Sequence, residues 1–140
     1  LQHVFTAERL DLAWLKGRTV TSLSGIAVPQ SFENSLRTMG ARVIHCERYA
    51  DHHRYHAQEI INAVNRAADL KADALLTTEK DAVRFPRLEV TPVPVYYLRV
   101  DIELMRGAEN FHEAVERICF RPPPRASAAR AQSVPVAEKT

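Results

Sequence analysis

The chain has 140 residues, of which 46% are hydrophobic and 26% are charged, and a chain of this size and balance can bury the core of one globular domain. Its formal net charge of +2 comes from acids and bases spread along the sequence, so no basic stripe marks a nucleic-acid interface and we expect no nucleic-acid partner. No apolar run is long enough to span a bilayer, so any membrane contact is expected to be peripheral.

Strand-like and helical patterns alternate along the first two thirds of the chain. Short runs of β-branched and other apolar residues predict strands, and apolar residues spaced three and four apart predict helices between them. The predicted strands comprise residues 19–23, 42–46 and 73–77, and the predicted helices comprise residues 29–39, about 56–70, and a short turn around 82–85. Strands separated by helices of this length favour right-handed crossovers. The predicted fold class is therefore α/β, a mainly parallel, Rossmann-like sheet with helices on both faces.

The two ends of the chain carry further predicted elements. A short edge strand is expected near Val4. Residues 95–104 alternate between apolar and polar side chains, which predicts a long, half-exposed edge strand. Phe111, Val115 and Ile118 predict a last amphipathic helix. The remaining sequence is rich in Pro, Ala, Ser and Arg, so we expect one α/β domain at residues 1–120 and a disordered tail at residues 121–140.

Three polar turns follow the predicted strands at their carboxyl ends. They are Ser24-Gly25-Ile26, Asp51-His52-His53 and Thr77-Thr78-Glu79-Lys80-Asp81. The carboxyl ends of parallel strands meet at one edge of the sheet, where open α/β sheets bind their ligands. We therefore expect these turns to line a single crevice, although they lie far apart in the sequence.

Simple structural roles explain several of these residues equally well. Ser24-Gly25 suits an ordinary strand-exit turn, because a short glycine pattern is weak evidence for a site. Glu79 and Asp81 favour the positive N-terminal end of a short helix. Lys80 does not fit that explanation, because a cation is unfavourable at a helix N-terminus unless an anion lies nearby.

The histidine turn is open to three interpretations. His52 and His56 share a face only if the turn is helical, so a metal site is weakly indicated. A solvated turn is as consistent with the residue types as a functional one. The position of Asp51 beside His52 favours the functional interpretation. A carboxylate can orient an imidazole and raise its basicity, as general-base catalysis requires. Adjacent side chains point apart, so His52 and His53 are expected to play different roles.

Together these motifs resemble a known family. The residues Ser24-Gly25-Ile26 with Pro29 and Phe32, Asp51-His52-His53 with Tyr55, and Leu76-Thr77-Thr78-Glu79-Lys80-Asp81-Ala82-Val83-Arg84 are similar in order and spacing to the C-terminal half of the tetraacyldisaccharide 4'-kinases of lipid A synthesis. The resemblance covers residues 18–99. It implies the C-terminal subdomain of a P-loop kinase, and the start at Leu1 in patterned sequence suggests a fragment of that longer protein.

The resemblance implies a phosphotransferase that moves the ATP γ-phosphate, with Mg²⁺, to the 4'-hydroxyl of a tetraacylated glucosamine disaccharide 1-phosphate. The setting it implies is the cytoplasmic face of the bacterial inner membrane, with peripheral membrane contact through the full-length protein. A cytosolic setting also suits Cys46 and Cys119, which lack C-x-x-C spacing. In this family the ATP- and magnesium-binding motifs lie in an N-terminal half, and the sequence contains no G-x-x-x-x-G-K-[ST]. We therefore expect this chain alone to be inactive.

The resemblance also implies roles for individual residues. His52 corresponds to the catalytic histidine, which activates the acceptor hydroxyl together with an aspartate from the N-terminal half. The supporting or substrate-binding residues are then Asp51, His53, Ser24, Gly25, Thr78, Glu79 and Lys80, and no metal ligand is expected in this chain. Two alternatives remain open: a non-catalytic Rossmann-like module that binds an anion or nucleotide, and a metal phosphoesterase, which needs more carboxylates at strand ends than Glu79 and Asp81 provide.

Overall fold

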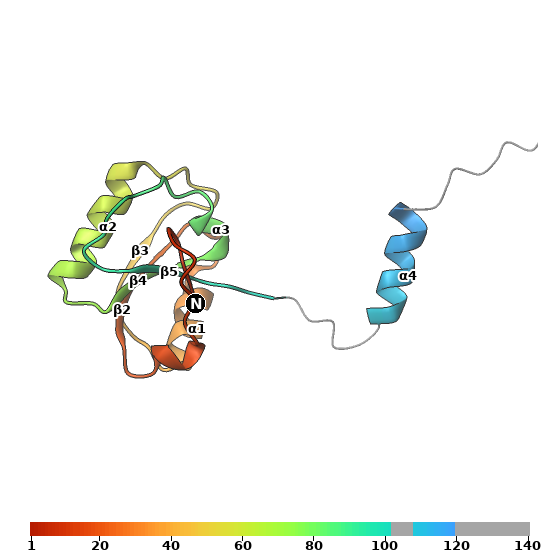
Figure 1. Ribbon diagram of the computed structural model, residues 1–140, viewed down its shortest axis with the longest axis horizontal. Helices are drawn as coiled ribbons and strands as arrows, with labels where there is room; N and C mark the ends of the chain where they lie inside the picture. Colours follow the sequence, from red (N-terminus) through yellow and green to blue (C-terminus); the bar gives the residue numbers. More distant parts are fainter. Residues whose placement is uncertain (102–107, 120–140) are drawn as a thin grey trace, which may run out of the picture. The chain divides into compact units, whose positions relative to one another are not determined.

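The structure is a computed structural model that describes residues 1–101 and 108–119 (Figure 1). It divides into two compact units, Leu1–Asp101 and Ile102–Thr140. The first unit contains the sheet and every predicted site residue. In the second, helix α4 (Ala108–Cys119) contains the three apolar residues that predicted it, so this helix is confirmed. The predicted tail at 121–140 lies outside the described residues.

A five-stranded sheet organises the first unit, in the order β1-β5-β4-β2-β3 within the part of the chain that the structure describes. Its strands are β1 (Gln2–His3), β2 (Thr19–Ser24), β3 (Arg42–Arg48), β4 (Ala74–Thr78) and β5 (Val95–Leu98). The strands β3, β2, β4 and β5 pair in parallel, and β1 pairs antiparallel with β5. The predicted α/β class and the three neighbouring parallel strands are confirmed.

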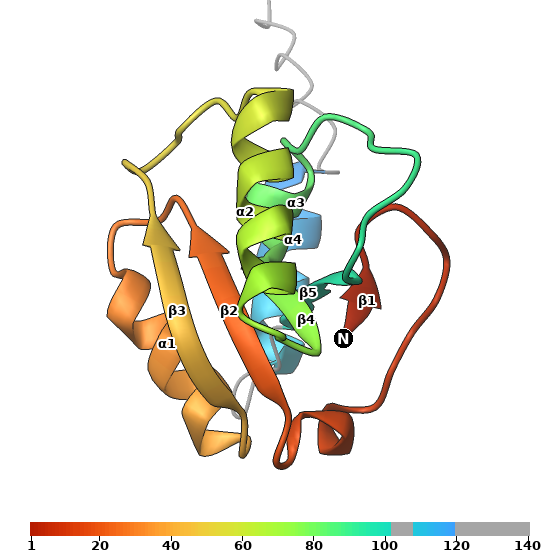
Figure 2. The ribbon, with the colours of Figure 1, turned by 90° about the vertical axis from the view of Figure 1, so that its left-hand side faces the viewer.

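Helices α1 (Pro29–Thr38) and α2 (Ala57–Asp69) cover opposite faces of this sheet (Figure 2). Side chains alternate along a strand, so each face supplies its own core. Under α2, the apolar cluster includes Leu23, Leu75 and Val95 of the sheet with Ile60 and Val64 of the helix. Under α1, it includes Val20, Leu76 and Tyr96 with Phe32 and Leu36, and also Leu15 of the 3-10 helix η1 (Leu12–Leu15). Both faces are therefore buried, as parallel sheets require.

Strand β5 differs from the predicted long edge strand. It ends at Leu98, and it is paired on both sides, with β4 and with β1. Its consecutive residues Val95 and Tyr96 are both buried, because each faces a different covered side of the sheet. Residues 99–101 do not continue the strand, and residues 102–104 lie outside the described residues. The prediction that residues 95–104 form an edge strand is wrong, because β1 pairs with the outer side of β5 and supplies the edge, next to the edge strand that was expected near Val4.

The short helix α3 (Glu79–Ala82) also begins earlier than predicted. Thr78, the last residue of β4, is its N-cap, and the Thr78 hydroxyl accepts from the Asp81 N–H. The strand therefore passes into the helix without an intervening loop, and Val83 lies beyond the helix, 80% exposed. This direct passage places the polar residues of α3 at the sheet edge.

An ion pair ties α1 to the end of β3. The Glu33 side chain is only 2% exposed and accepts from Arg48 Nε at 2.7 Å and from Arg48 Nη2 at 2.8 Å. These hydrogen bonds hold the pKa of Glu33 below its usual value of 4.5, because protonation would weaken them. The pair therefore ties α1, the helix between β2 and β3, to the end of β3.

The substitution Glu33→Gln tests this pair through its pH dependence. A carboxyl whose pKa is lower in the folded state stabilises fully above its unfolded value of 4.5, and that stabilisation is lost as pH falls through the folded value. We expect the variant to have a lower free energy of unfolding at neutral pH and a shallower decline below pH 4.5, in urea titrations across pH. Glu89→Gln, which changes an exposed carboxyl, is the control. Equal pH profiles for the two variants would contradict the account.

Candidate active site

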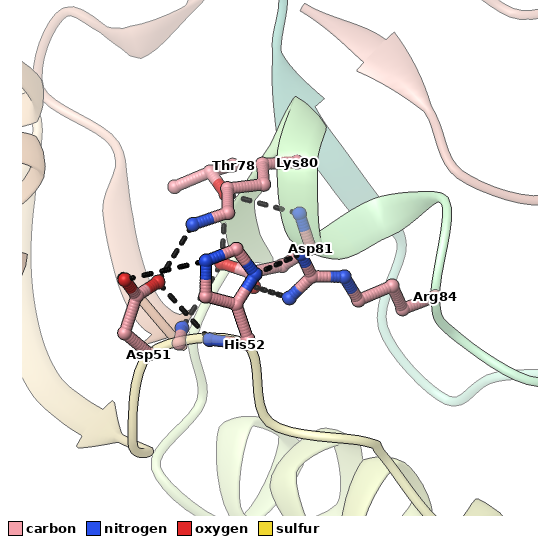
Figure 3. A network of polar contacts seen from close by, with 7 residues as sticks. Asp51, His52, Thr78, Lys80, Asp81 and Arg84 are labelled. Atoms are coloured by element: carbon pink, nitrogen blue, oxygen red, sulfur yellow. Dashed lines mark hydrogen bonds and ion pairs between the residues drawn. The ribbon is translucent and has the colours of Figure 1, made fainter. Parts of the chain in front are cut away.

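Three polar turns lie together at the carboxyl ends of the parallel strands (Figure 3). Gly25 follows β2 and Asp51 follows β3. Lys80 and Asp81 lie in α3, directly after β4, and Figure 3 shows them beside Asp51 and His52. The Gly25 N–H donates to Asp81 Oδ2 at 3.0 Å, and Lys80 Nζ donates to Asp51 Oδ1 at 2.6 Å. Neighbouring side chains of α3 thus reach both other turns, and the expected convergence is confirmed.

Asp81 is the buried centre of this arrangement. Its side chain is 0% exposed, and Oδ2 accepts from the Thr78 hydroxyl at 2.7 Å as well as from Gly25. Asp81 Oδ1 has no hydrogen-bond partner among the described residues, and its near cation is Arg84, whose Nη1 lies 3.9 Å away. The simple explanation, a carboxylate at a helix start, accounts for where Asp81 lies but not for its bond across to another strand.

The anion that Lys80 requires is Asp51. Their side chains are 41% and 37% exposed, and their hydrogen bond is the main reason that the pKa of Asp51 is held below its usual range. The His52 N–H also donates to Asp51 Oδ1, at 3.0 Å. The Asp51 carboxylate is therefore kept ionised and fixed in place, with Lys80 on one side and the histidine backbone on the other.

His52 is the most accessible side chain of the group, at 71% exposed. Its backbone φ of 62° lies in the left-handed region, which costs free energy for a residue with a Cβ and is found where surrounding structure enforces it, often at functional sites. The ring Nδ1 lies 3.2 Å from Arg84 Nη2, and Nε2 lies 3.6 Å from Asp51 Oδ2. A guanidinium only donates, so this bond requires Nδ1 to accept and places the proton of the neutral ring on Nε2.

His53 points away from His52 and serves a different purpose. Its Nε2 lies 3.0 Å and 3.1 Å from the two Glu59 oxygens, and its ring stacks on Tyr49 at 4.6 Å. Glu59 Oε2 also accepts from the His56 N–H at the start of α2, and this bond, followed by the His53 bond, lowers the pKa of Glu59. The predicted divergence of the two histidines is confirmed, and His53 anchors the turn to α2.

Two of the other predicted site residues lie outside this network. The Ser24 side chain is buried at 1% exposure, and its carbonyl accepts from the Tyr49 N–H at 2.9 Å, so it supports the strand end. Glu79 Oε2 accepts from the Val100 N–H at 3.4 Å, toward β5. Glu79 lines a cavity of about 470 Å³, whose other lining residues are Ile26, Val28, Ser31, Phe32, Ser35, Thr78, Lys80, Leu98 and Val100. Thr78 and Lys80 thus border both the cavity and the polar network.

Three residues at this edge of the sheet were not among the predicted site residues: Tyr55, Arg84, and Asp81, which belongs to the third predicted polar turn. Tyr55 is 8% exposed, and burial together with the charge of Asp81 raises the pKa of its phenol well above the usual range. Asp81 is three residues after an N-cap threonine, and that spacing was a usable signal for its local bond. Nothing local in the sequence indicates that Arg84 reaches His52, because that contact depends on how two loops meet.

Neither a metal-binding group nor a membrane-spanning helix is found in the described part of the chain. No three histidine, cysteine, aspartate or glutamate side chains among residues 1–101 and 108–119 are grouped to hold a metal ion. Within the same ranges, no helix has the length and apolar character needed to cross a bilayer.

The family model and the similar proteins of known name agree on one family. The model of the family described as tetraacyldisaccharide-1-P 4'-kinase matches residues 2–119. The tetraacyldisaccharide 4'-kinase of Syntrophus aciditrophicus is 29% identical over 108 residues, which are 77% of this chain and 29% of that protein. Those of Anaeromyxobacter sp. strains Fw109-5 and K are 35% identical over 115 residues and 39% identical over 124 residues; the alignments cover 82% and 83% of this chain and 31% and 32% of those proteins. The chain thus spans about three tenths of these relatives, and no solved structure matches it.

The substitution Gly25→Ala tests the close packing of the three turns. A Cβ at this position would lie 2.6 Å from the Tyr55 hydroxyl oxygen and 3.1 Å from the Ala50 carbonyl oxygen. We expect a loss of about 1–3 kcal/mol in the free energy of unfolding, the usual cost of overpacking, measured by urea titration. In the Tyr55→Phe background the loss should be smaller, because the closest atom is gone. An equal loss in both backgrounds would show that the hydroxyl is not the obstacle.

Proposed function

The chain belongs to the tetraacyldisaccharide-1-P 4'-kinase family, and on that premise we propose that it is the C-terminal part of an ATP-dependent lipid A-precursor kinase. The acceptor would be the 4'-hydroxyl of a tetraacyl disaccharide 1-phosphate, an acylated glucosamine disaccharide. Because the chain spans about three tenths of its relatives, we assign the complete activity to a longer protein. We place that protein at the cytoplasmic face of the bacterial inner membrane, in peripheral contact with it.

The observation that carries the proposal is the exposed His52 held among charged partners at the strand ends. Phosphoryl transfer needs the acceptor oxygen to be positioned and its proton accepted as the bond forms. The His52 ring is open to an incoming hydroxyl, while Asp51 and Arg84 lie on either side of it. The His52 Nδ1 can accept a proton only when Arg84 Nη2 no longer donates to it. A substrate that carries a negative phosphate would favour this, because the phosphate would compete for the Arg84 guanidinium.

The nucleotide and its magnesium do not fit this chain by itself. The sequence contains no phosphate loop, and the described residues offer no grouped metal ligands. We therefore assign ATP and Mg²⁺ mainly to the rest of the longer protein, where they would supply the phosphoryl group and neutralise its charge. The residues of this chain would orient the acceptor hydroxyl and take up its proton. That the isolated chain is inactive stays a prediction.

The substitution His52→Ala in the complete protein tests this role. The side chain is exposed, so the melting temperature should hardly change. We expect kcat to fall on the order of 10²-fold or more, as when a positioned general base is lost, with little change in the KM of the acceptor. Added imidazole should restore part of kcat, because the exposed position leaves room for it.

His53→Ala is the matched control. It removes the contacts to Glu59 and Tyr49, so it should lower the melting temperature, reduce kcat less than His52→Ala, and respond to no imidazole. Full kcat in His52→Ala would remove His52 from the reaction. If His53→Ala alone loses kcat and is rescued by imidazole, the acting base is the neighbouring residue.

A further inference from the structure

We propose that Asp81 is a positioning residue for this reaction: its buried carboxylate fixes the separation of the three polar turns and, through α3, aims His52. The inference rests on the proposed function for its kinetic consequence and on the geometry for its structural one. Asp81 is fully buried, and among the predicted site residues Gly25 lies directly against it, through the Gly25 N–H.

The Asp81 carboxylate is costly to bury, because its side chain is fully removed from solvent. A carboxylate taken out of water costs several kcal/mol unless donors replace its hydration. Asp81 Oδ2 accepts hydrogen bonds from Gly25 and Thr78, whereas Oδ1 has the Arg84 guanidinium 3.9 Å away and the Tyr55 hydroxyl beside it, neither in full hydrogen-bond geometry. A buried charge whose hydrogen bonds are incomplete adds little to the stability of a fold. Buried polar groups of this kind are expected at functional sites.

Asp81 is connected to His52 through α3 and the residues that flank this helix. Asp81 and its N-cap Thr78 bond one another twice: the Asp81 N–H donates to Thr78 Oγ1 at 3.1 Å, and Thr78 Oγ1 donates to Asp81 Oδ2. This locks the start of α3 against β4. Lys80 precedes Asp81 in α3, and Arg84 lies just beyond the end of α3, where its N–H donates to the Asp81 carbonyl at 2.9 Å. The Lys80 side chain reaches Asp51 and the Arg84 side chain reaches His52. A shift of α3 therefore moves both partners of the histidine turn.

Tyr55 lies between Asp81 and the histidine turn. Tyr55, three residues after His52, packs its ring edge-on against Phe85 and His53, each at 4.9 Å between centroids. A Cβ built on Gly25 meets the Tyr55 hydroxyl at 2.6 Å and Asp81 Oδ1 at 3.3 Å, so both groups lie against the same glycine. Burial and the Asp81 charge keep the pKa of Tyr55 raised and its phenol neutral. Asp81 thus contacts Gly25 directly, and it approaches the histidine turn through Tyr55, which follows that turn in the sequence.

The kinetic test compares Asp81→Asn with Asp73→Asn in the complete protein. Asp73 lies at the opposite end of β4 and also accepts a backbone N–H, from Thr19 at 2.8 Å, so the same atom exchange is made away from the site. We expect Asp81→Asn to lower kcat about tenfold or more, as small misplacements of reacting groups do, with a much smaller change in KM. Asp73→Asn should keep kcat. Equal kcat in the two variants would overturn the proposal.

A double-mutant cycle separates positioning from a general loss of stability. If Asp81 acts through His52, then Asp81→Asn should cost nothing further in a His52→Ala background, because groups that act as a unit are not additive. If Asp81→Asn lowers kcat by the same factor with and without His52, it acts independently and the proposal fails.

A structural readout on the 140-residue chain keeps the inference testable even if the proposed kinase function is wrong. We expect Asp81→Asn to shift the NMR resonances of the His52 ring and to weaken the hydrogen-exchange protection of the Gly25 amide, while Asp73→Asn changes neither. Unchanged His52 and Gly25 signals in Asp81→Asn overturn the positioning role. A complete protein that transfers no phosphate, together with shifted signals, overturns the proposed function and leaves the positioning role standing.

Discussion

The buried hydrogen bond between the Gly25 N–H and the Asp81 carboxylate is the contact on which the polar edge of the sheet depends. A parallel sheet brings strand ends to one side, but it does not fix how far apart the following turns lie. The bond ties the turn after β2 to the helix after β4. Gly25 permits this close approach, because any side chain there would meet the Tyr55 hydroxyl. The buried Asp81 carboxylate and the absence of a Cβ at Gly25 thus set the distance between the turns.

The charged side chains around this contact form ion pairs, and His52 beside them stays largely exposed to solvent. Asp51 is held by Lys80, and Asp81 lies near Arg84. Lys80 contacts Asp51 and Arg84 contacts both Asp81 and His52, while the imidazole of His52 remains the most exposed titratable group of these residues, on a backbone of positive φ. Such an arrangement favours a group that meets a ligand over one that supports the fold.

Strands β2, β3 and β4, helices α1 and α2 and the meeting of the three turns could be predicted, because hydrophobic periodicity and βαβ order act along the sequence. The divergence of His52 and His53 followed from their adjacency. The length and place of β5 could not be predicted, because they depend on pairing with Gln2–His3, over 90 positions away. Similarly, Glu79 and Asp81 look alike in the sequence, and only packing turns Asp81 into the network and Glu79 toward Val100.

The central claim is that these turns form the acceptor side of a 4'-kinase, and product analysis tests it most directly. The complete protein would be incubated with ATP, Mg²⁺ and the tetraacyl disaccharide 1-phosphate, and the lipid product examined by ³¹P NMR. The account predicts a second phosphomonoester signal, coupled to the proton at the 4' carbon. A lipid that keeps its 1-phosphate as the sole phosphomonoester, or gains phosphate at another position, would contradict it.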